Sequence, residues 1–453
     1  MNNKILKLFS DFISIQSVST DPSRHQEILK AVEFLKKEID LLGFEVKTYQ
    51  RDNCSPLIIA KYYFKDDRPQ DRKTIGIYAH YDVQPEDPVE QWKSPPFELT
   101  FKNGKIFGRG VADDKGHIIQ VLTALDLLIK KNKLKNNIVL IFEGEEENES
   151  KNFESLITQA RPPFAKASEG LGKIDVFYIL DMGMKAKNIP QIYYGLRGIM
   201  TGEIKIKIGT TDLHSGVFGN RVLNPVQIIA ELLAKIKDGK TNKIKVPGFY
   251  DQVQKISESE TAILSEYTLS DSEEKKNSGV KEFVGGFLSS KVFPSFEVNG
   301  IDSGYTGRGF KTIIPAEAMM RFSIRLVPNQ KPKVIKKIIG EFIKNNLPKE
   351  IDYKLRIDDG CEPFYTDFEN PYAKKTAKIL SSVFKNKTYF NRSGGSIAAV
   401  ETLQRLFAKP IILTGFTLPD ENIHAPNENI DEEMFEKGIK VLEKILSPSI
   451  NSG

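Results

Sequence analysis

Two histidines and three carboxylates in this chain have the chemistry of metal ligands and share a pattern of position: His80, Asp113, Glu147, Asp181 and His424. Each lies just past an apolar stretch that we interpret as a buried strand, or in the loop that leads to the next helix. Imidazole nitrogens and carboxylate oxygens bind divalent cations such as zinc. The pattern therefore predicts that all five side chains gather along one rim of a sheet and form a two-metal site.

The neighbouring residues suggest how such a site would divide its tasks. A two-metal hydrolase needs one carboxylate that bridges ions about 3.5 to 4 Å apart, and a free carboxylate that acts on water. Asp113, on a glycine-flanked loop at a helix start, suits the bridge. Asp82 lies on the same side of the strand as His80 and would accept the second N–H of its imidazole. Glu146 and Glu147 point in different directions, so one can bind metal while the other takes a proton.

The elements that must position these residues alternate between strands and helices. Apolar runs predict buried strands at residues 74–79, 137–142, 174–180 and 410–413. A helix is predicted after Asp113 from apolar positions at helical spacing: Ile118, Ile119, Leu122, Leu125 and Leu128. Apolar strands that alternate with helices indicate an α/β fold, with a mostly parallel sheet and helices on both faces. Such sheets bind ligands beyond the carboxyl ends of their strands.

The pattern changes near Arg197. Residues 202–208 alternate between apolar and polar, which is typical of a half-exposed antiparallel strand. Further elements are predicted as a helix at 225–236, a strand at 318–326, a helix at 333–345 and a strand at 352–357. They indicate an inserted α+β domain. We therefore predict a catalytic domain of residues 1–196 and 393–453 around an insertion of residues 197–392, with a surface loop at 161–172.

Composition limits the classes of function. The 453 residues are 40% hydrophobic and 28% charged, as in ordinary globular proteins of two or more domains. The net charge of +5 comes from 65 basic and 60 acidic residues spread along the chain, so no nucleic-acid partner is expected. The N-terminus favours an amphipathic helix over a signal peptide, and no stretch approaches the roughly 20 apolar residues of a membrane span. Cys54 and Cys361 are the only cysteines, which favours a reducing, cytoplasmic compartment.

Short motifs along the chain resemble those of a known family. They are HYDVQP with a following Trp92 and PPF, GRGVADDKG, EGEEE, GLRG, DLHSGVFGN, KTIIP, RFSIRLVPNQ, GGSI and HAPNE. In this order, from about residue 75 to 430, they resemble the dinuclear-zinc metallopeptidase family of carnosinases, cytosolic dipeptidases, aminoacylases and desuccinylases, most closely its dipeptidase branch. The resemblance implies two Zn²⁺ ions per chain, or Mn²⁺ or Co²⁺ in their place.

The resemblance also implies residue roles at the metal rim. His80 and Asp181 would bind one zinc, Glu147 and His424 the other, and Asp113 would bridge them. The remaining carboxylates would be a general base and an orienting group, Glu146 and Asp82. This assignment aligns the third and fourth acidic residues of EGEEE with the base and the ligand of the family.

Further roles fall in the inserted domain, which the resemblance makes a lid and dimerisation module. His214 of DLHSG would reach the site of the partner subunit and stabilise the oxyanion. Arg325 would hold a substrate carboxylate through a bidentate pair, assisted by Thr312, Gly395 and Ser396. The alternative for Arg325 is a buried strand arginine paired with an acidic neighbour.

Two departures from the family pattern bear on the substrate. Asn148 and Glu149 replace a Gly-Ser pair that often follows the paired glutamates, and Asp359 stands where relatives often have a histidine. An aspartate there would repel a substrate carboxylate. We predict a metal-dependent, cytoplasmic, homodimeric peptidase that cleaves dipeptides or similar small amides. The alternatives are a deacylase of N-acyl amino acids and a binding protein that lost turnover.

Overall fold

The chain folds into two compact units. The computed structural model describes residues 1–52, 54–64, 72–161, 171, 173–267, 275–276 and 278–447. Unit 1 comprises Met1–Tyr194, Thr366–Asn391 and Ile397–Gly453, and unit 2 comprises Gly195–Tyr365 and Arg392–Ser396. Unit 2 is therefore an insertion into unit 1. Within the described part of the chain, no helix combines the length and the apolar character that crossing a membrane requires.

A mixed sheet forms the centre of unit 1. Its strands lie in the order β1 (Glu45–Tyr49), β2 (Leu57–Tyr62), β6 (Asn137–Glu143), β3 (Thr74–His80), β7 (Val176–Ile179), β17 (Ile411–Leu413) and β8 (Gln191–Leu196), and β16 (Tyr389–Arg392) also pairs with β8. The central pairs, β6 with β3, β3 with β7 and β7 with β17, are parallel, and the outer pairs are antiparallel. Every residue of β3 and β7 is buried, which explains their uninterrupted apolar sequences.

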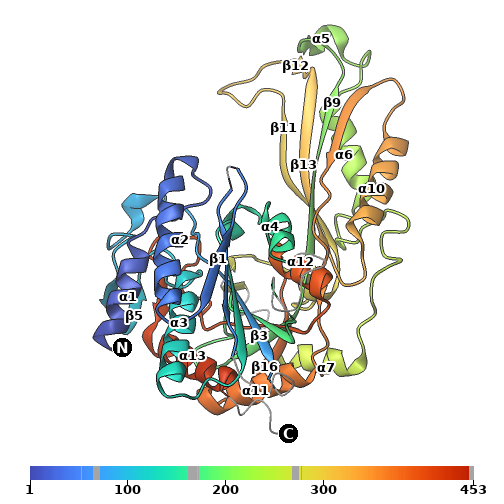
Figure 1. Cartoon of the computed structure of the whole chain (residues 1–453). Coiled ribbons are helices and arrows are strands. Elements are labelled where there is room, and N and C mark those ends of the chain that lie inside the picture. Colours follow the sequence, from blue (N-terminus) through green and yellow to red (C-terminus); the bar gives the residue numbers. More distant parts are fainter. Residues whose placement is uncertain are drawn as a thin grey trace. The chain divides into compact units, whose positions relative to one another are not determined.

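Helices cover both faces of this sheet (Figure 1). They are α1 (Asn3–Ile13), α2 (His25–Asp40), α3 (Lys115–Lys130), α4 (Phe153–Ala160), α11 (Pro371–Phe384), α12 (Ala398–Phe407) and α13 (Glu432–Leu446). On one face Ile77 of β3 joins the core that includes α3 and α13. On the other face Tyr78 packs on Phe153 of α4, and Phe177 of β7 packs on Phe407 of α12. Alternate residues of one strand thus serve two cores.

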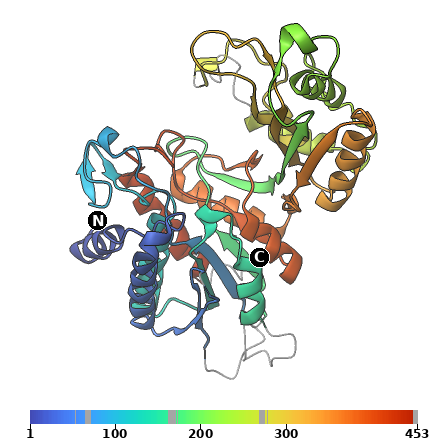
Figure 2. The same ribbon diagram turned by 90° about the horizontal axis from the view of Figure 1, so that it is seen from above.

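Two smaller features complete unit 1. The helices α1 and α2 lie side by side in both views (Figure 1, Figure 2), where Phe12 stacks on Phe34 with ring centroids 5.0 Å apart. A short antiparallel sheet joins β4 (Thr100–Lys102), β5 (Lys105–Phe107) and β18 (Asn429–Asp431). This sheet brings the chain just before α3 next to the chain just before α13, which places two of the candidate loops beside each other.

Unit 2 is built on an antiparallel sheet. The strands lie in the order β11 (Ser295–Ser303), β13 (Glu317–Leu326), β9 (Gly198–Lys207) and β14 (Asp352–Ile357). Helices α6 (Pro225–Ile236) and α10 (Pro332–Asn346) pack on one face, and their apolar residues share a core with the buried residues of β9 and β13. The shorter elements are α5 (Ser215–Phe218), α7 (Glu258–Tyr267), α9 (Ser289–Val292), β10 (Leu213–His214), β12 (Ile313–Ile314) and β15 (Phe364–Tyr365). Each buried residue in β9 alternates with a more exposed one, as the sequence predicted for residues 202–208.

The structure differs from the sequence prediction in three places. The main sheet has antiparallel outer pairs, among them β1 and β2, which a short connection without a helix joins. Residues 366–391 belong to unit 1 rather than to the insertion, since Leu380 and Phe384 of α11 lie in the same core as α13. Residues 392–396 belong to unit 2. Most of the predicted loop at 161–172 lies outside the described residues.

Candidate metal centre

The rim of the parallel strands delivers three of the five candidate ligands. His80 is the last residue of β3, Asp181 follows β7 by two residues, and Glu147 follows β6 by four. Because β3 is parallel to both β6 and β7, these strand ends meet at one edge of the sheet. Asp113 reaches the same edge from the loop before α3, and His424 from the loop before β18.

Three of these side chains converge around His80. The His80 Nε2 lies 3.0 Å from Asp113 Oδ1 and 3.9 Å from Asp181 Oδ1. The ligand atoms of the three residues all lie within 4.8 Å of one another. His80 is fully buried, and the two carboxylates are nearly so. One imidazole and two carboxylates at this spacing form a candidate site for one divalent cation.

A second group forms around the other oxygen of Asp113. His424 Nε2 lies 2.8 Å from Asp113 Oδ2 and 3.3 Å from Glu147 Oε1. The three ligand atoms again lie within 4.8 Å of one another. Asp113 is thus common to both groups and turns one carboxylate oxygen toward each histidine, which is the geometry that a bridging carboxylate needs.

The electrostatics of the rim fit a pair of cations. Burial together with repulsion from Glu146 raises the pKa of Asp181 well above its ordinary value. Burial opposes ionisation of Asp113, but hydrogen bonds from His424 and His80 outweigh it and hold its pKa below the ordinary value. The same contacts, with Glu147, raise the pKa of His424 to about 10. Buried carboxylates at such density require positive charge, and divalent cations supply it.

Asp82 lies beside His80, as predicted. The His80 Nδ1 is 3.1 Å from the Asp82 backbone carbonyl and 3.4 Å from its Oδ1. The Asp82 Oδ2 accepts hydrogen bonds from Ser19 Oγ at 2.6 Å and from the Glu147 backbone N–H at 3.1 Å. An Nδ1–H directed at these oxygens would leave the Nε2 lone pair available to a cation when that cation replaces the hydrogen bond from Nε2 to Asp113. Asp82 therefore connects the histidine of one group with the backbone of a carboxylate in the other.

Glu146 belongs to neither group. It begins a single turn of 3-10 helix at Glu146–Asn148 and is only partly covered. Burial of its carboxyl, reinforced by the nearby Glu147 and Asp113 carboxylates against the attraction of His80, raises the pKa of Glu146 to about 8. The preceding Glu145 instead accepts a hydrogen bond from the Ser55 N–H at 2.9 Å. A carboxylate next to the rim but outside the ligand groups has the placement that a general base needs.

The remaining predicted residues lie in unit 2, in two places. His214 pairs with Ile313 in the short β10 and β12 ladder, and the Thr312 carbonyl accepts the Ser215 N–H at 3.1 Å. The exposed His214 accepts a hydrogen bond on Nδ1 from the Gly216 N–H at 3.0 Å. His214 and Thr312 are therefore neighbours at the end of the unit that carries α5 (Figure 1).

Arg325 forms the second place. Its Nη1 donates to Ser396 Oγ at 2.9 Å, and no ion pair with a carboxylate is found among the described residues. Arg197, for which the sequence suggested no role, is a neighbour: it donates from Nε to the Gly394 carbonyl at 3.0 Å, and its backbone N–H binds the Gly395 carbonyl. Burial, and then repulsion from Arg325, lowers the pKa of Arg197 to about 10. Neither half-buried guanidinium forms an ion pair with a carboxylate in the described ranges of the chain, which favours an anion at this place.

Asp359, the residue expected to oppose that anion, is highly exposed. Its carboxylate pairs with Lys336 Nζ at 2.7 Å, and this contact lowers the pKa of Asp359. The lysine neutralises much of the charge that would repel a substrate carboxylate. Asn148, the other departure, accepts a hydrogen bond from Lys151 at the exposed end of the 3-10 turn.

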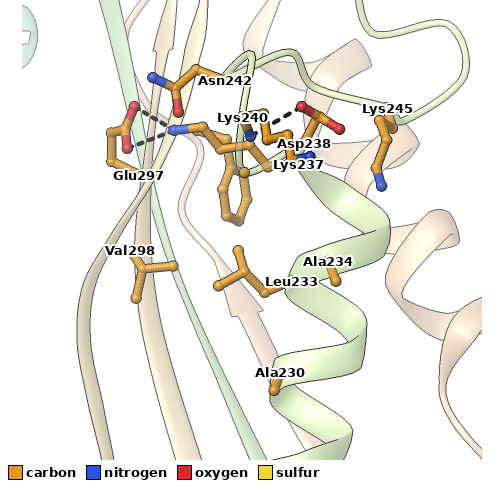
Figure 3. A pocket seen from close by; sticks show the side chains of 12 residues that line it. Ala230, Leu233, Ala234, Lys237, Asp238, Lys240, Asn242, Lys245, Glu297 and Val298 are labelled. Carbon is orange, nitrogen blue, oxygen red and sulfur yellow. Dashed lines mark hydrogen bonds and ion pairs between the residues drawn. The ribbon is translucent and has the colours of Figure 1, made fainter. Parts of the chain in front are cut away.

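A groove of about 850 Å³ lies on unit 2 between α6 and the edge strand β11 (Figure 3). Leu233 and Val298 line its apolar part, and Lys237 binds both carboxylate oxygens of Glu297 at 2.8 Å at one end. None of the residues predicted to take part in catalysis lines this groove. The candidate chemistry lies elsewhere.

Comparisons with known proteins show the family of the chain. Residues 76–447 match the model of peptidase family M20/M25/M40. The chain belongs to this family. It is 30% identical to the Cys-Gly metallodipeptidase DUG1 of Candida albicans, over 97% of this chain and 93% of that protein.

Two solved structures extend the comparison. The M20 family metallo-carboxypeptidase Sso-CP2 of Sulfolobus solfataricus superposes with a TM-score of 0.86 at 28% identity, covering 98% of this chain and 99% of that one. Human carnosine dipeptidase 1 superposes with a TM-score of 0.79 at 25% identity, covering 98% and 95%. The predicted family, fold class and enzyme class are thereby confirmed: the chain is a metallopeptidase related to the dipeptidase branch.

Proposed function

We propose that this protein hydrolyses the peptide bond of dipeptides at a pair of divalent cations, Zn²⁺ or, in its place, Mn²⁺ or Co²⁺. The observation that carries the proposal is the position of Asp113 between two ligand groups, with His80 and Asp181 on one side and His424 and Glu147 on the other. Two relatives support the substrate class by their names, since one is a Cys-Gly metallodipeptidase and another a carnosine dipeptidase.

The residues of the chain suggest the order of events. Cations held by the two groups would lower the pKa of water and polarise the scissile carbonyl. Glu146 takes a proton from the attacking water and later gives it to the leaving amine. Asp82 keeps the His80 ring in one tautomer through both steps. The carboxylate of the substrate is held by Arg325, with Ser396 fixing the guanidinium and Gly395 offering polar backbone nearby. Thr312 lies beside His214 and would assist the substrate from that second place.

The oxyanion donor in this proposal is His214 from a second copy of the chain. Support comes from its exposure in unit 2, where large apolar side chains are also exposed on the same segments: Val217, Leu223 and Phe310. Exposed apolar groups of this kind mark interaction surfaces. A homodimer would bury them and supply His214 to the partner's metal centre. We extend the proposal to a reducing, cytoplasmic location, because the two cysteines of the chain, Cys54 and Cys361, are not joined by a disulfide.

A substrate panel tests the proposal. The purified protein, stripped by chelator and reloaded with Zn²⁺, Mn²⁺ or Co²⁺, is assayed with Cys-Gly, β-alanyl-histidine, longer peptides with a free carboxyl end, and N-acetyl and N-succinyl amino acids. We expect chelator-sensitive cleavage of dipeptides and two bound ions per chain by elemental analysis. Preferred cleavage of N-acyl amino acids would show that the protein is a deacylase and not a dipeptidase. Absence of both bound metal and hydrolysis would contradict the proposal that the protein is an enzyme.

A further inference from the structure

Glu428 is a buried carboxylate that binds the backbone of the loop carrying Asp113. Its side chain is fully covered. Oε1 accepts hydrogen bonds from the N–H groups of Ala112 at 2.9 Å, Gly110 at 3.0 Å and Asp113 at 3.1 Å. Oε2 accepts from Gly110 N–H at 3.0 Å and from Arg109 Nη1 at 2.8 Å. Both carboxylate oxygens are thus used by one loop.

The backbone around Glu428 also bonds to the chain that leads into the Asp113 loop. Asn429 of β18 pairs with Phe107 of β5, and the next step of that ladder joins the Gly108 N–H to the Glu428 carbonyl at 3.1 Å. Gly110 has φ +88°, and a Cβ there would lie 2.8 Å from Val83 Cγ1. A glycine is therefore required for the turn that directs successive N–H groups at the carboxylate.

Arg109 extends the connection to a third loop. Its Nη2 donates to the Pro85 carbonyl at 2.9 Å, and its guanidinium lies 5.4 Å from the centre of the Trp92 ring. Only 1% of the Arg109 side chain is exposed, so its charge depends on Glu428 for neutralisation. The loops after β3, before α3 and before β18 therefore meet at one buried ion pair. Each of these loops follows or contains a candidate ligand: His80, Asp113 and His424.

We propose that Glu428 is a positioning residue that sets the binding geometry of the two-metal site before any metal is present. The inference rests on the proposed metal centre. Glu428 fixes the backbone of Asp113 through its N–H, and it lies four residues after His424, so one carboxylate sets the distance between the bridge and a terminal ligand. Loss of this acceptor frees the Asp113 loop while every ligand side chain remains.

The variant Glu428→Gln tests this role. The amide keeps the size of the side chain but places an NH₂ group against the Arg109 and Gly110 donors, so at least one N–H loses its acceptor. Residues that orient metal ligands typically change metal affinity by about 10- to 100-fold. We expect a fall in Zn²⁺ affinity of that size, measured by competition with a chromophoric chelator. Turnover should largely recover at saturating Zn²⁺, because no ligand or base is missing. Glu428→Asp, which keeps the charge, should recover part of the affinity.

Glu421 provides a matched control. It is also fully buried and also accepts two backbone N–H groups, from Leu418 and Asp431, both at 2.7 Å. Its side chain bonds to Leu418 and Asp431 and, among the described residues, to none of the Asp113 loop, so Glu421→Gln should lower the melting temperature without changing Zn²⁺ affinity more than about twofold. Equal losses of affinity in the two variants would overturn the proposal, since general loosening of the loop would then explain both. Unchanged affinity in folded Glu428→Gln would overturn it as well.

Hydrogen exchange keeps the test independent of variant folding. In the metal-free unmodified protein, we expect slow exchange at the amides of Gly110, Ala112 and Asp113, because Glu428 already holds them. Exchange at the rate of free peptide without metal, with protection only after Zn²⁺ is added, would contradict preorganisation by Glu428. Failure of the unmodified protein to bind Zn²⁺ would instead contradict the proposed metal centre.

Discussion

The metal rim of unit 1 and the exposed end of unit 2 differ in how they hold their polar residues. At the rim, His80, Asp82 and Asp113 are buried and each makes hydrogen bonds to residues distant in sequence. At the end of unit 2, the His214 side chain is exposed, and the hydrogen bond that it makes among the described residues is to Gly216, two residues along the chain. The candidate ligands of the rim all come from unit 1, whereas no hydrogen bond to Nε2 of His214 is found within the described part of the chain.

This difference suggests a division between binding metal and completing the site. A rim fixed by buried hydrogen bonds can bind cations in a single chain. An exposed imidazole on a short two-residue strand gains a defined role only when another surface covers it. The comparison predicts that variants at the rim and in unit 2 will differ in whether a second chain can rescue them.

The largest effect is expected for Glu146→Gln. The amide cannot accept the proton of the attacking water, so turnover should fall by about 10³- to 10⁴-fold while two metal ions stay bound. Steady-state kinetics together with elemental analysis measure both. Glu149→Gln is the control, since Glu149 lies in the same acidic segment with its side chain 82% exposed and should leave turnover unchanged. Near-normal turnover in Glu146→Gln would contradict the assignment of Glu146 and would indicate that another glutamate is the general base.

His214→Ala should lower turnover by about 10²- to 10³-fold, the effect of losing one oxyanion donor. Its metal content should stay normal, because no rim residue changes. Mixing it with inactive Glu146→Gln should restore activity through hybrid dimers in which one site has both groups. Each variant mixed with itself is the control. Absence of recovery, when subunit exchange is demonstrated by differently tagged chains, would show that His214 acts within its own chain.

Some features of the fold and of the rim could be predicted from the sequence, and others could not. His80 and Asp181 follow uninterrupted apolar runs. Such runs indicate buried strands, so the sequence also predicted where these strands end and which residues lie at the rim of the sheet. The helix at residues 371–384 is amphipathic, so its sequence indicates that one face packs on a core. The same pattern does not indicate which of the two cores that is. The sequence prediction placed this helix in the insertion, whereas it belongs to unit 1.

The roles of Glu428 and Arg197 could not be found from sequence for a related reason. Glu428 accepts N–H groups from residues more than 300 positions earlier, and a backbone donor carries no residue type that a pattern can detect. Arg197 lies at the point where the chain enters unit 2, and its contacts with Gly394 and Gly395 appear only once residues 392–396 are known to return there.

Arg325→Met is expected to raise KM for dipeptides by about 10- to 100-fold, since a hydrogen bond to a charged group contributes about 1.5 to 3 kcal/mol. The value of kcat should change less, because the substrate carboxylate is bound in both ground and transition states. Arg321→Met on the same strand is the control: Arg321 is exposed and pairs with Glu203 at 3.0 Å. An equal KM for substrates with and without a free carboxylate in the unmodified protein would contradict this role of Arg325.

The smallest effect is a coupling between metal uptake and protons at the rim. The raised pKa values of His424, about 10, and of Glu146, about 8, mean that both groups hold protons at pH 7 without metal. His424 must lose its proton to bind a cation, and the added positive charge favours ionised Glu146, so uptake releases protons. Zn²⁺ affinity should therefore rise with pH between 6 and 8, by about tenfold per pH unit for each proton released. Calorimetry of Zn²⁺ binding in buffers of different ionisation enthalpy counts these protons. The variant His424→Ala should release fewer protons than the unmodified protein. Zero release at pH 7 would mean that the rim is already deprotonated before metal binds.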